Sequence, residues 1–532
     1  MAKRPPAPAA GASLIRGGQA VVPPPDPAAG VRPPDPAAGV RPPNPAPEIR
    51  PPGPVLAILE TLWVSGHAGY VVGGSLRDVI LGREPADWDM ATDARPDRLL
   101  ELFPGAVYEN RFGTVAVRQD GTDFEITTFR SDHDYADHRR PHRVEFGDAI
   151  ADDLARRDFT INALAWGADP PGAVPHSAAD APGAVPHSAA DAPGAVAALG
   201  DVAALGDAPG AGATPALLDP HGGIADIEAR SIRAVGDPRR RFEEDALRMV
   251  RAVRLAATLD FGIEAGTLAA IQARSSLVAH LSAERLAAEL DKLLSADRPS
   301  IGLRLMAATG ILEVVAPELA AQRGIPQNKI PGEDLWDHTV RTVDAVPADR
   351  PVVRLAALLH DIGKPLTMAD GHFHAHDAVG ADLAFAFMTR LKFPRVVTER
   401  VVHLVRHHMF VYDESWGDSG VRRFIQRIGR DALTPLFLLR EADNEGSGVG
   451  RTAHGLDDLR RRVAQQLARP TVLDRGDLAV GGSDLIAELG LEEGPVLGHI
   501  LDQLLDQAVT DPAINDRPTL LLLAQAMLTE DR

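Results

Sequence analysis

The stretch that decides the fold of this chain reads VGGSLRDVILG at residues 72–82 and is followed by Asp87-Trp88-Asp89. Its two glycines let the backbone approach a bound phosphate closely, and a helix that begins there turns its N-terminal dipole toward that anion. In an extended segment alternate residues project from the same face, so Asp87 and Asp89 can share divalent ions while Trp88 packs behind them. Such ions would activate an attacking hydroxyl and stabilise a leaving pyrophosphate. An isolated Asp-x-Asp would be an ordinary solvated turn, but the preceding glycines favour a phosphate site.

Runs rich in β-branched and aromatic residues flank this stretch and predict a sheet. They occupy residues 70–72, 115–117 and 124–129, with a helix expected at 76–81. These elements predict an α/β or α+β head. From about residue 237 onward apolar residues recur at helical spacing, for example over 246–253, so the remainder is expected to be all-α.

The composition of the 532 residues sets further limits. With 45% hydrophobic residues the chain can bury several cores and form two to four domains. It has no apolar run of about 18 residues and does not begin with an apolar signal, so a soluble cytoplasmic protein with no membrane partner is expected. The absence of cysteine excludes disulfides, thiolate nucleophiles and Cys-ligated metals. Any metal must therefore be held by His, Asp and Glu.

The formal net charge of −19 counts against a nucleic-acid-binding protein. A nucleic acid contacts only one face, however, and almost all the positive charge is arginine, whose planar fork suits phosphates. An arginine-lined cleft on an acidic body is compatible with this composition.

Two low-complexity segments interrupt the pattern. Residues 1–53 are rich in Pro, Ala and Gly with a nine-residue repeat, and are expected to be a disordered tail. Residues 169–216 contain an eleven-residue repeat and are expected to be a surface insertion. Repeat expansion explains His176 and His187 better than metal binding does.

Three further motifs follow the first in order along the chain. They are DLARRDFTINA at 153–163, DPHGG at 219–223 with Asp226, and EDALRMVRAVR at 244–254. Together with the first stretch they resemble the class II CCA-adding tRNA nucleotidyltransferases and bacterial poly(A) polymerases of the polymerase-β-like superfamily. The resemblance covers approximately residues 54–168 and 217–532. It implies an α+β fold: a polymerase-β-like head with a mixed sheet and helices, followed by an all-α neck and an HD-type helical domain.

The resemblance also implies roles for particular residues. Asp87 and Asp89 would hold Mg²⁺ for catalysis, and Glu125 could be a third carboxylate, although a partly exposed strand glutamate is an equally simple interpretation. The nucleotide-binding residues would be Gly73, Gly74, Arg77, Asp78, Arg157, Asp158, Asn162, Asp245, Arg248 and Arg251. The motif at 219–223 is given a structural role.

Asp245 and Arg248 are of special interest because they are three residues apart and are expected on one helix face. An acceptor and a forked donor can then be offered together to a base edge. Cytosine and adenine both present an amino group beside a ring acceptor, whereas uracil and guanine present a carbonyl instead. The pair could therefore select C and A, or it could be an ordinary i, i+3 salt bridge.

A second set of metal-binding side chains lies further along the chain. His338, the doublet His360-Asp361 and Asp443 resemble the core ligands of the HD phosphohydrolase superfamily, and His374, His376, His407 and His408 lie among them. Imidazoles and carboxylates on several helices can form a mono- or dinuclear site for Mn²⁺, Ni²⁺, Fe²⁺ or Mg²⁺. Such a domain could hydrolyse phosphate esters, or it could serve only for packing or RNA contact.

The predicted organisation and function follow from these segments. The expected domains are a tail at 1–53, a head at 54–236 with the insertion 169–216, a nucleotide-recognition neck at 237–325, an HD-type domain at 326–450 and a tRNA-binding or packing region at 451–532. The predicted function is template-independent addition of C, C and A to the 3′ end of tRNA from CTP and ATP. The polar segment 130–141 resembles the family's flexible loop and favours this over poly(A) or A-only addition. Two other classes stay open: an HD phosphohydrolase with a non-catalytic RNA-binding head, and a plain RNA-binding module.

Overall fold

The structure is a computed structural model that describes residues 49–108, 113–135, 141–170, 215–327, 329–369, 372–469 and 471–530. The N-terminal repeats and the repeats of the insertion, with His176 and His187, lie outside the described residues. So do residues 109–112, and residues 136–140 of the polar segment 130–141 that was used above to favour CCA addition.

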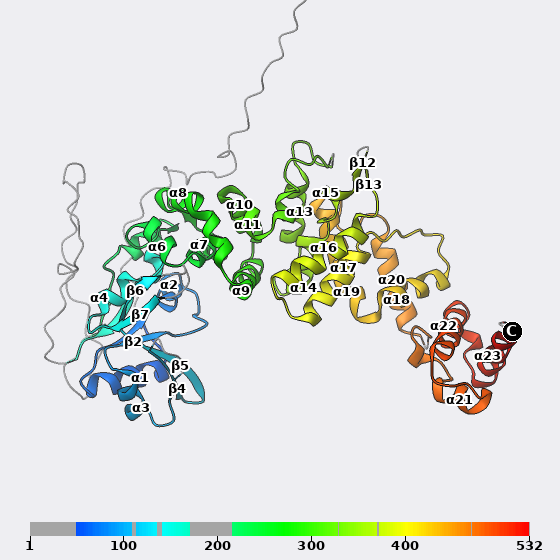
Figure 1. Cartoon of the computed structure of the whole chain (residues 1–532), viewed down its shortest axis with the longest axis horizontal. Helices are drawn as coiled ribbons and strands as arrows, with labels where there is room; N and C mark the ends of the chain where they lie inside the picture. Colours follow the sequence, from blue (N-terminus) through cyan, green and yellow to red (C-terminus); the bar gives the residue numbers. More distant parts are fainter. Residues whose placement is uncertain are drawn as a thin grey trace, which may run out of the picture. The chain divides into compact units, whose positions relative to one another are not determined.

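The head is formed by a seven-stranded mixed sheet with strand order β3-β4-β5-β2-β1-β8-β9. Figure 1 labels β2, β4 and β5 of this sheet, with helices α1 and α3 nearby. Strands β2 and β5 are parallel, and the other neighbouring pairs are antiparallel. The strands are β1 (Gly69–Val72), β2 (Met90–Thr92), β3 (Val107–Tyr108), β4 (Thr114–Gln119), β5 (Thr122–Thr128), β8 (Ala165–Ala168) and β9 (Ala216–Leu218), with a separate hairpin of β6 (Arg130–Tyr135) and β7 (Pro141–Phe146). The helices are α1 (Gly53–Val64), α2 (Gly74–Ile80), α3 (Pro96–Leu102), α4 (Ile150–Ala155) and α5 (Gly223–Glu228). The predicted strands and the predicted helix are confirmed as β1, β4, β5 and α2.

Both faces of strand β1 are buried, which explains its uninterrupted apolar sequence. Tyr70 and Val72 belong to a small core with Phe129, whereas Val71 and Met90 belong to the main core on the other face. The period-two alternation of a strand thus divides β1 between two cores. As a result, the end of β1, where Gly73 begins the turn, is held from both sides.

The chain beyond the head is predominantly helical, as predicted. The neck contains α6 (Pro238–Glu244), α7 (Leu247–Leu259), α8 (Ala265–Arg274), α9 (Ala283–Leu294), α10 (Pro299–Thr309), α11 (Ile311–Val315) and α12 (Pro317–Ala320). The next helices are α13 (Leu335–Ala345), α14 (Pro351–Leu359), α15 (Lys364–Thr367), α16 (His376–Arg390), α17 (Arg395–His407), α18 (Asp418–Ile428) and α19 (Arg430–Gly446). Two short strand pairs depart from the all-α expectation: parallel β10 (Ser231–Ile232) with β11 (Gly262–Ile263), and the hairpin β12 (Met368–Ala369) with β13 (His372–Phe373).

Two hydrophobic cores account for the helical part. The main core runs from Ile49 to Leu473, so it is continuous from the head through the neck into the HD-type region. A second core, from Val472 to Ala524, joins α21 (Gly482–Leu489), α22 (Pro495–Thr510) and α23 (Arg517–Glu530), which follow α20 (Leu456–Leu467). The domain boundaries predicted from the sequence stay predictions.

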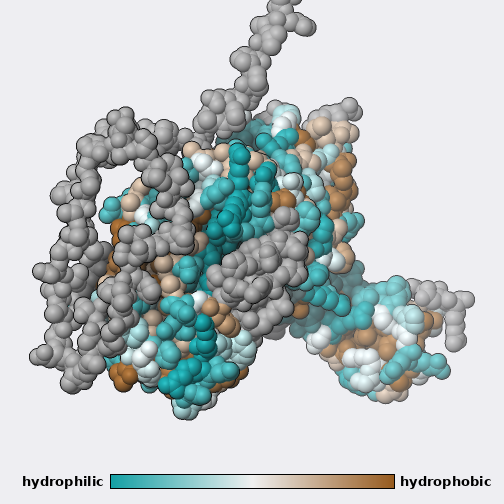
Figure 2. Space-filling view, turned by 60° about the vertical axis from the view of Figure 1, so that its left-hand side comes forward, coloured by the Kyte–Doolittle hydropathy of each residue, from teal (hydrophilic) through white to brown (hydrophobic). Residues whose placement is uncertain are grey.

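One face of the molecule is drawn in Figure 2. On the face drawn in Figure 2, hydrophilic residues dominate and apolar residues form small patches between them. None of the helices in the described ranges has the combined length and apolarity needed to cross a bilayer.

Candidate functional site

The turn between β1 and α2 depends on glycine. Gly73 has a φ of +85°, a value that side chains with a Cβ rarely adopt, and a Cβ there would lie 2.8 Å from Nη1 of Arg157. The Gly73 N–H donates to the Leu164 carbonyl at 3.1 Å, which fixes the turn against the segment before β8. The Arg157 guanidinium is therefore held directly against the phosphate-binding turn predicted from the sequence.

Asp87 and Asp89 lie immediately before β2 rather than within it, because β2 begins at Met90. The backbone is nonetheless held alongside β1, since the Val72 N–H donates to the Asp89 carbonyl at 3.0 Å. Trp88 is partly buried against the main core, as predicted. The two carboxylates are exposed, and neither has a hydrogen-bond or ion-pair partner among the described residues.

The electrostatics of this pair favour a cation. Loss of water around the Asp89 carboxylate raises its pKa, and the neighbouring charge of Asp87 raises it further, while Arg157 acts in the opposite direction. Unpaired acids that repel each other beside a phosphate-binding turn fit a divalent ion, because hard cations prefer carboxylate oxygens.

Glu125 lies on the strand next to the two aspartates. In the parallel pair β2–β5, Met90 is opposite Ile126, so one residue earlier Asp89 is beside Glu125. Residues in register on parallel strands project from the same face. Glu125 is exposed, as Asp89 is, and this register is compatible with a third carboxylate, which stays a prediction.

Arg77 and Asn162 connect the first two motifs. Nη1 of Arg77 donates to Oδ1 of Asn162 at 2.7 Å, and its other nitrogens donate to the Asp78 carboxylate at 2.9 and 3.0 Å. Arg157 is oriented by the buried Asp153, which accepts from its Nη2 at 3.0 Å. Nε of Arg157 is buried without a hydrogen-bond partner within the described part of the chain. This arginine has donor capacity left for a ligand.

Asp158 forms an ion pair with Arg251 that joins the head to the neck. Nε and Nη2 of Arg251 each lie 2.7 Å from Oδ2 of Asp158, and Asn162 and the Phe159 N–H donate to the other oxygen. Burial alone would raise the pKa of Asp158, but Arg251 and Asn162 together lower it to about 2. The resemblance implied that Asp158, Asn162 and Arg251 bind the nucleotide. In the structure Asp158 contacts both of the other residues.

Because the folded-state pKa is lowered from 3.8 to about 2, this pair stabilises the fold above pH 4, and the contribution is lost as the pH falls toward 2. We expect Asp158→Asn to reduce the free energy of unfolding by about 2 kcal/mol at pH 7. Denaturant unfolding of wild type and variant should show the difference shrinking below pH 4. Asp148→Asn, at an exposed pair with Arg95, is the matched control. A difference that does not depend on pH would contradict this assignment.

The predicted placement of Asp245 and Arg248 on one helix is wrong. Asp245 has extended backbone angles between α6 and α7, and its Oδ1 accepts from the Leu247 N–H at 3.0 Å. An aspartate that bonds a backbone N–H at a helix start stabilises that start, which explains why the helix is interrupted there. Oδ2 of Asp245 accepts from Arg285 of α9 at 2.8 Å, and Arg248 donates to Glu244 at 2.8 Å. The two side chains are thus engaged by other partners and do not form an i, i+3 salt bridge.

The HD-type region brings together all four side chains predicted as its ligands. Nε2 of His338 lies 3.1 Å from Nε2 of His360, 3.4 Å from Oδ2 of Asp361 and 3.3 Å from Oδ1 of Asp443. The four residues are buried. Burial would raise the pKa of Asp361 and Asp443, yet neighbouring cationic and histidine groups hold both well below the ordinary value. Burial lowers the pKa of His360, which favours the neutral, ligating imidazole.

Two histidines that the sequence did not distinguish complete this cluster. His376 and His408 approach the second oxygen of Asp361, at 3.4 and 3.7 Å from Nε2, and their Nδ1 atoms face the backbone carbonyls of Phe373 and Val405. Both Nε2 atoms are buried and have no hydrogen-bond partner within the described ranges. Asp361, His376 and His408 therefore form a second three-ligand group beside His338, His360 and Asp361. Orphaned nitrogens aimed at a shared carboxylate fit a divalent ion.

Comparison with known proteins covers nearly all of the described chain. The Poly A polymerase head domain matches residues 69–174, the "probable RNA and SrmB-binding site of polymerase A" matches 260–323, and the HD domain matches 328–445. The CCA-adding enzyme of Levilactobacillus brevis is 32% identical over 87% of this chain and 95% of its own length. That of Geobacillus thermodenitrificans is 38% identical over 87% and 94%. The chain belongs to the CCA-adding enzyme family.

A solved structure supports the same relationship for this member of the CCA-adding family. The CCA-adding enzyme of Bacillus stearothermophilus in complex with CTP is 26% identical, with a TM-score of 0.61 over 90% of this chain and 98% of that one. The nucleotidyltransferase and HD domains both imply dependence on divalent metal.

Proposed function

We propose that this chain adds C, C and A to the 3′ end of tRNA from CTP and ATP, with the chemistry at Asp87 and Asp89. The match to CCA-adding enzymes over almost their whole length carries this proposal, together with the exposed carboxylates of Asp87 and Asp89, which follow the Gly73 turn. The CTP in the Bacillus stearothermophilus structure supports the nucleotide class. This reaction favours a cytoplasmic location, where tRNA is matured.

Different residues of the head would serve different steps of an in-line displacement at phosphorus. Mg²⁺ held by Asp87 and Asp89, with Glu125 as a third carboxylate, would lower the pKa of the tRNA 3′-hydroxyl and neutralise the departing pyrophosphate. Gly73 and Gly74 admit the triphosphate to the backbone. Arg157, with its unpartnered Nε, donates to the phosphates, while Arg77, Asp78 and Asn162 hold the turn in place.

Asp245 and Arg248 remain our candidates for base selection. They do not share one helix, because Asp245 lies before α7 and Arg248 lies within it. Asp245 is fixed by the Leu247 N–H and by Arg285, and Arg248 by Glu244 and by the Arg156 carbonyl at 3.0 Å. A carboxylate and a guanidinium that are each held by a second group make a rigid template, and rigidity is what discrimination between base edges requires.

We expect Asp245→Ala and Arg248→Ala each to reduce the preference for CTP and ATP over UTP and GTP by about tenfold, since a good base contact is worth ~1–3 kcal/mol. Single-nucleotide incorporation measured with each of the four triphosphates tests this. Arg274→Ala, which removes an exposed neck pair with Glu243, is the control. Unchanged selectivity in both variants would leave Asp245 and Arg248 with structural roles alone.

The HD-type region is proposed as a metal-dependent phosphohydrolase. Mn²⁺, Ni²⁺, Fe²⁺ or Mg²⁺ held by His338, His360, Asp361 and Asp443 would supply a nucleophilic water and polarise a phosphate. Water adds to phosphorus, the ester P–O bond breaks, and the leaving oxygen takes a proton to give an alcohol and phosphate. The pocket above these ligands has a volume of about 480 Å³ and is also lined by Lys329, Lys364 and Arg440, which suits an anionic substrate.

The C-terminal helices are better suited to packing than to contact with tRNA phosphates. Residues 471–532 contain twelve Asp and Glu but three Arg and no Lys, so they account for nine of the nineteen net negative charges. A surface of that sign repels a phosphate backbone. We therefore propose that tRNA binds mainly through the preceding segments.

The decisive experiment is incubation of the protein with Mg²⁺, labelled CTP or ATP, and tRNAs ending before CCA, after C and after CC. Addition of two C and one A followed by a stop is the expected result. Long A tails would identify a poly(A) polymerase, and addition of A alone to the CC end would identify an A-adding enzyme. Phosphate release without nucleotide transfer would identify the hydrolase alternative.

A further inference from the structure

The segment that leads from the neck into α13 places a cation beside the HD-type metal ligands. Nζ of Lys329 donates to Oγ of Ser447 at 2.8 Å and lies 3.8 Å from Oδ1 of Asp443. Asp443 lies in the last turn of α19, and Ser447 directly follows that helix. One lysine therefore ties the segment before α13 to the helix that carries a proposed metal ligand.

The oxygen of Asp443 that faces Lys329 also faces two other candidate ligands. This oxygen, Oδ1, lies 3.3 Å from Nε2 of His338 and 3.9 Å from Nε2 of His360. A divalent ion held by these residues would be drawn to the same oxygen as the Lys329 ammonium. Two cations a few ångströms apart repel each other, and the repulsion is stronger inside a protein than in water. The ion and the bound lysine therefore compete for one carboxylate oxygen.

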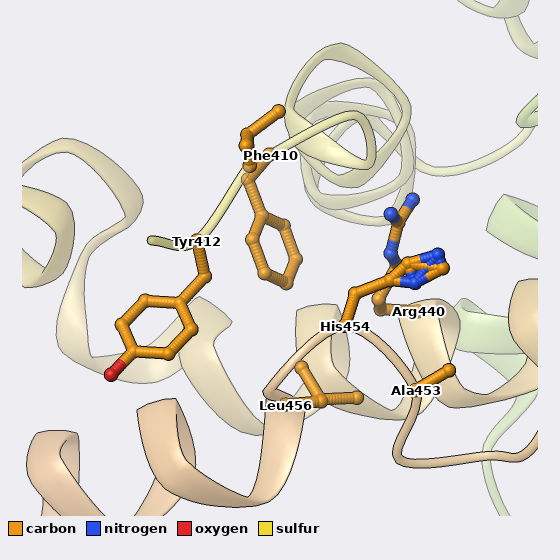
Figure 3. A pocket seen from close by; sticks show the side chains of 7 residues that line it. Phe410, Tyr412, Arg440, Ala453, His454 and Leu456 are labelled. Carbon is orange, nitrogen blue, oxygen red and sulfur yellow. The ribbon is translucent and has the colours of Figure 1, made fainter. Parts of the chain in front are cut away.

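The other two cations that line this pocket are fixed more firmly than Lys329. Arg440 lies on α19 itself, and its guanidinium is 5.7 Å from the centre of the buried Phe410 ring. Figure 3 shows both side chains on the wall of the neighbouring pocket. Nη1 of Arg440 donates to the other oxygen of Asp443, Oδ2, at 3.3 Å. Lys364 is buried and belongs to α15. Lys329 is thus the cation that can leave the pocket without movement of a helix.

The segment that carries Lys329 rests on α19 through side chains. Next to Lys329, the Ile330 side chain packs over Gly448, where an added Cβ would lie 3.1 Å from Cδ1 of Ile330. Residues 329, 331 and 332 are exposed, and Asp334 begins α13 with a capping box. The segment is therefore fixed where it enters α13. Loss of the Lys329 contact would weaken its attachment to α19 without disturbing either helix.

We propose that Lys329 couples the segment before α13 to the HD metal site: a divalent ion bound by Asp443 displaces the lysine and releases residues 329–332 from α19. The coupling is reciprocal, so the bound lysine weakens metal binding by the same factor by which the metal weakens the lysine contact. The released residues belong to the connection between the neck and the HD-type region. The proposal rests on the metal site of the proposed hydrolase and adds its regulation.

Mn²⁺ titration by calorimetry, in the full-length protein with Asp89→Ala in the head, tests the competition. Lys329→Met removes the charge and keeps the length of the side chain, so it should bind Mn²⁺ at least about tenfold more tightly than the parent protein. Lys392→Met, at an exposed pair with Glu284, is the matched control and should bind Mn²⁺ as the parent does. Unchanged or weaker binding in Lys329→Met would overturn the proposal.

Limited digestion with trypsin tests the release of the segment, because trypsin must engage the Lys329 side chain itself. Mn²⁺ should speed cleavage between Lys329 and Ile330 by about fivefold or more, since cleavage follows the population of the open state. Cleavage after Lys392, measured in the same digest by mass spectrometry, should not change. The acceleration should be lost in Asp361→Asn, which weakens the metal site.

The two measurements separate failure of this proposal from failure of the metal assignment. Cleavage after Lys329 that ignores Mn²⁺, in a protein that binds Mn²⁺ at this site, would overturn the coupling and leave the metal site standing. Absence of Mn²⁺ binding in both the parent and Lys329→Met would overturn the metal site and the coupling together.

Discussion

Replacement of Asp87 or Asp89 by alanine is expected to lower nucleotide transfer to tRNA about a thousandfold or more, because several kcal/mol of charge stabilisation in the transition state depend on the bound ions. Both side chains are exposed and unpartnered among the described residues, so their loss leaves no buried group unsatisfied. The free energy of unfolding should be unchanged or slightly larger, since the repulsion that raises the pKa of Asp89 is removed. Single-turnover incorporation of CTP and denaturant unfolding measure the two quantities.

The matched control for these variants is Asp123→Ala. Asp123 is an exposed aspartate on β5, two residues before Glu125, and forms an exposed pair with Arg118. It should retain wild-type incorporation. Normal transfer by either Asp87→Ala or Asp89→Ala would remove the metal assignment in the head.

Asp361→Asn is expected to weaken divalent-metal binding in the HD-type region at least about a hundredfold, because loss of an outer-shell partner alone costs ~10- to 100-fold. Asp361 is the carboxylate shared by both three-ligand groups, so a single change affects both of these ligand sets. Mn²⁺ titration by calorimetry measures the loss, and an Asp89→Ala background removes the contribution of the head. Nucleotide transfer in the Asp361→Asn variant with an intact head should continue.

Two further variants keep this prediction testable. Asp361 also neutralises Lys364 at 2.7 Å, so His408→Ala serves as a ligand variant that leaves that pair intact. Asp382→Asn, at an exposed pair with Arg406, is the control that should bind metal normally. Unchanged Mn²⁺ binding in both ligand variants would mean that this cluster is a buried polar network without a metal.

The parts of the site that the sequence predicted well are local in the chain. The turn at Gly73 and the neighbouring aspartates depend on residues within one strand, one turn and one helix. The spacing of these residues alone predicts a site for phosphate and metal. The contacts of Asp158 with Arg251 and of Asp245 with Arg285 join residues 93 and 40 positions apart. These contacts depend on how the neck helices pack, and the periodicity of apolar residues in the sequence does not specify that packing.

The error at Asp245 has a local cause that could have been recognised. An aspartate two residues before Leu247 is a typical helix-start residue, and the apolar periodicity that follows does not require the helix to extend backward through it. For the HD-type region the histidine doublets were visible, but spacing could not separate His376 and His408 from their neighbours. His407 faces His403, with ring centres 4.6 Å apart, and only tertiary structure places His408 toward Asp361.

The buried Arg354 has a consequence for how this chain can change through evolution. Its guanidinium donates to the carbonyls of Leu294 and Ala296 at the end of neck helix α9 and to Val346 after α13. Backbone carbonyls at the end of the neck thus accept hydrogen bonds from a side chain of the HD-type region. The two regions also share one hydrophobic core. A lineage could lose the HD metal ligands and keep nucleotide transfer, whereas loss of the helices themselves would remove the donor to the Leu294 and Ala296 carbonyls. We therefore expect substitutions of the HD metal ligands to be tolerated better than truncation of the HD-type helices.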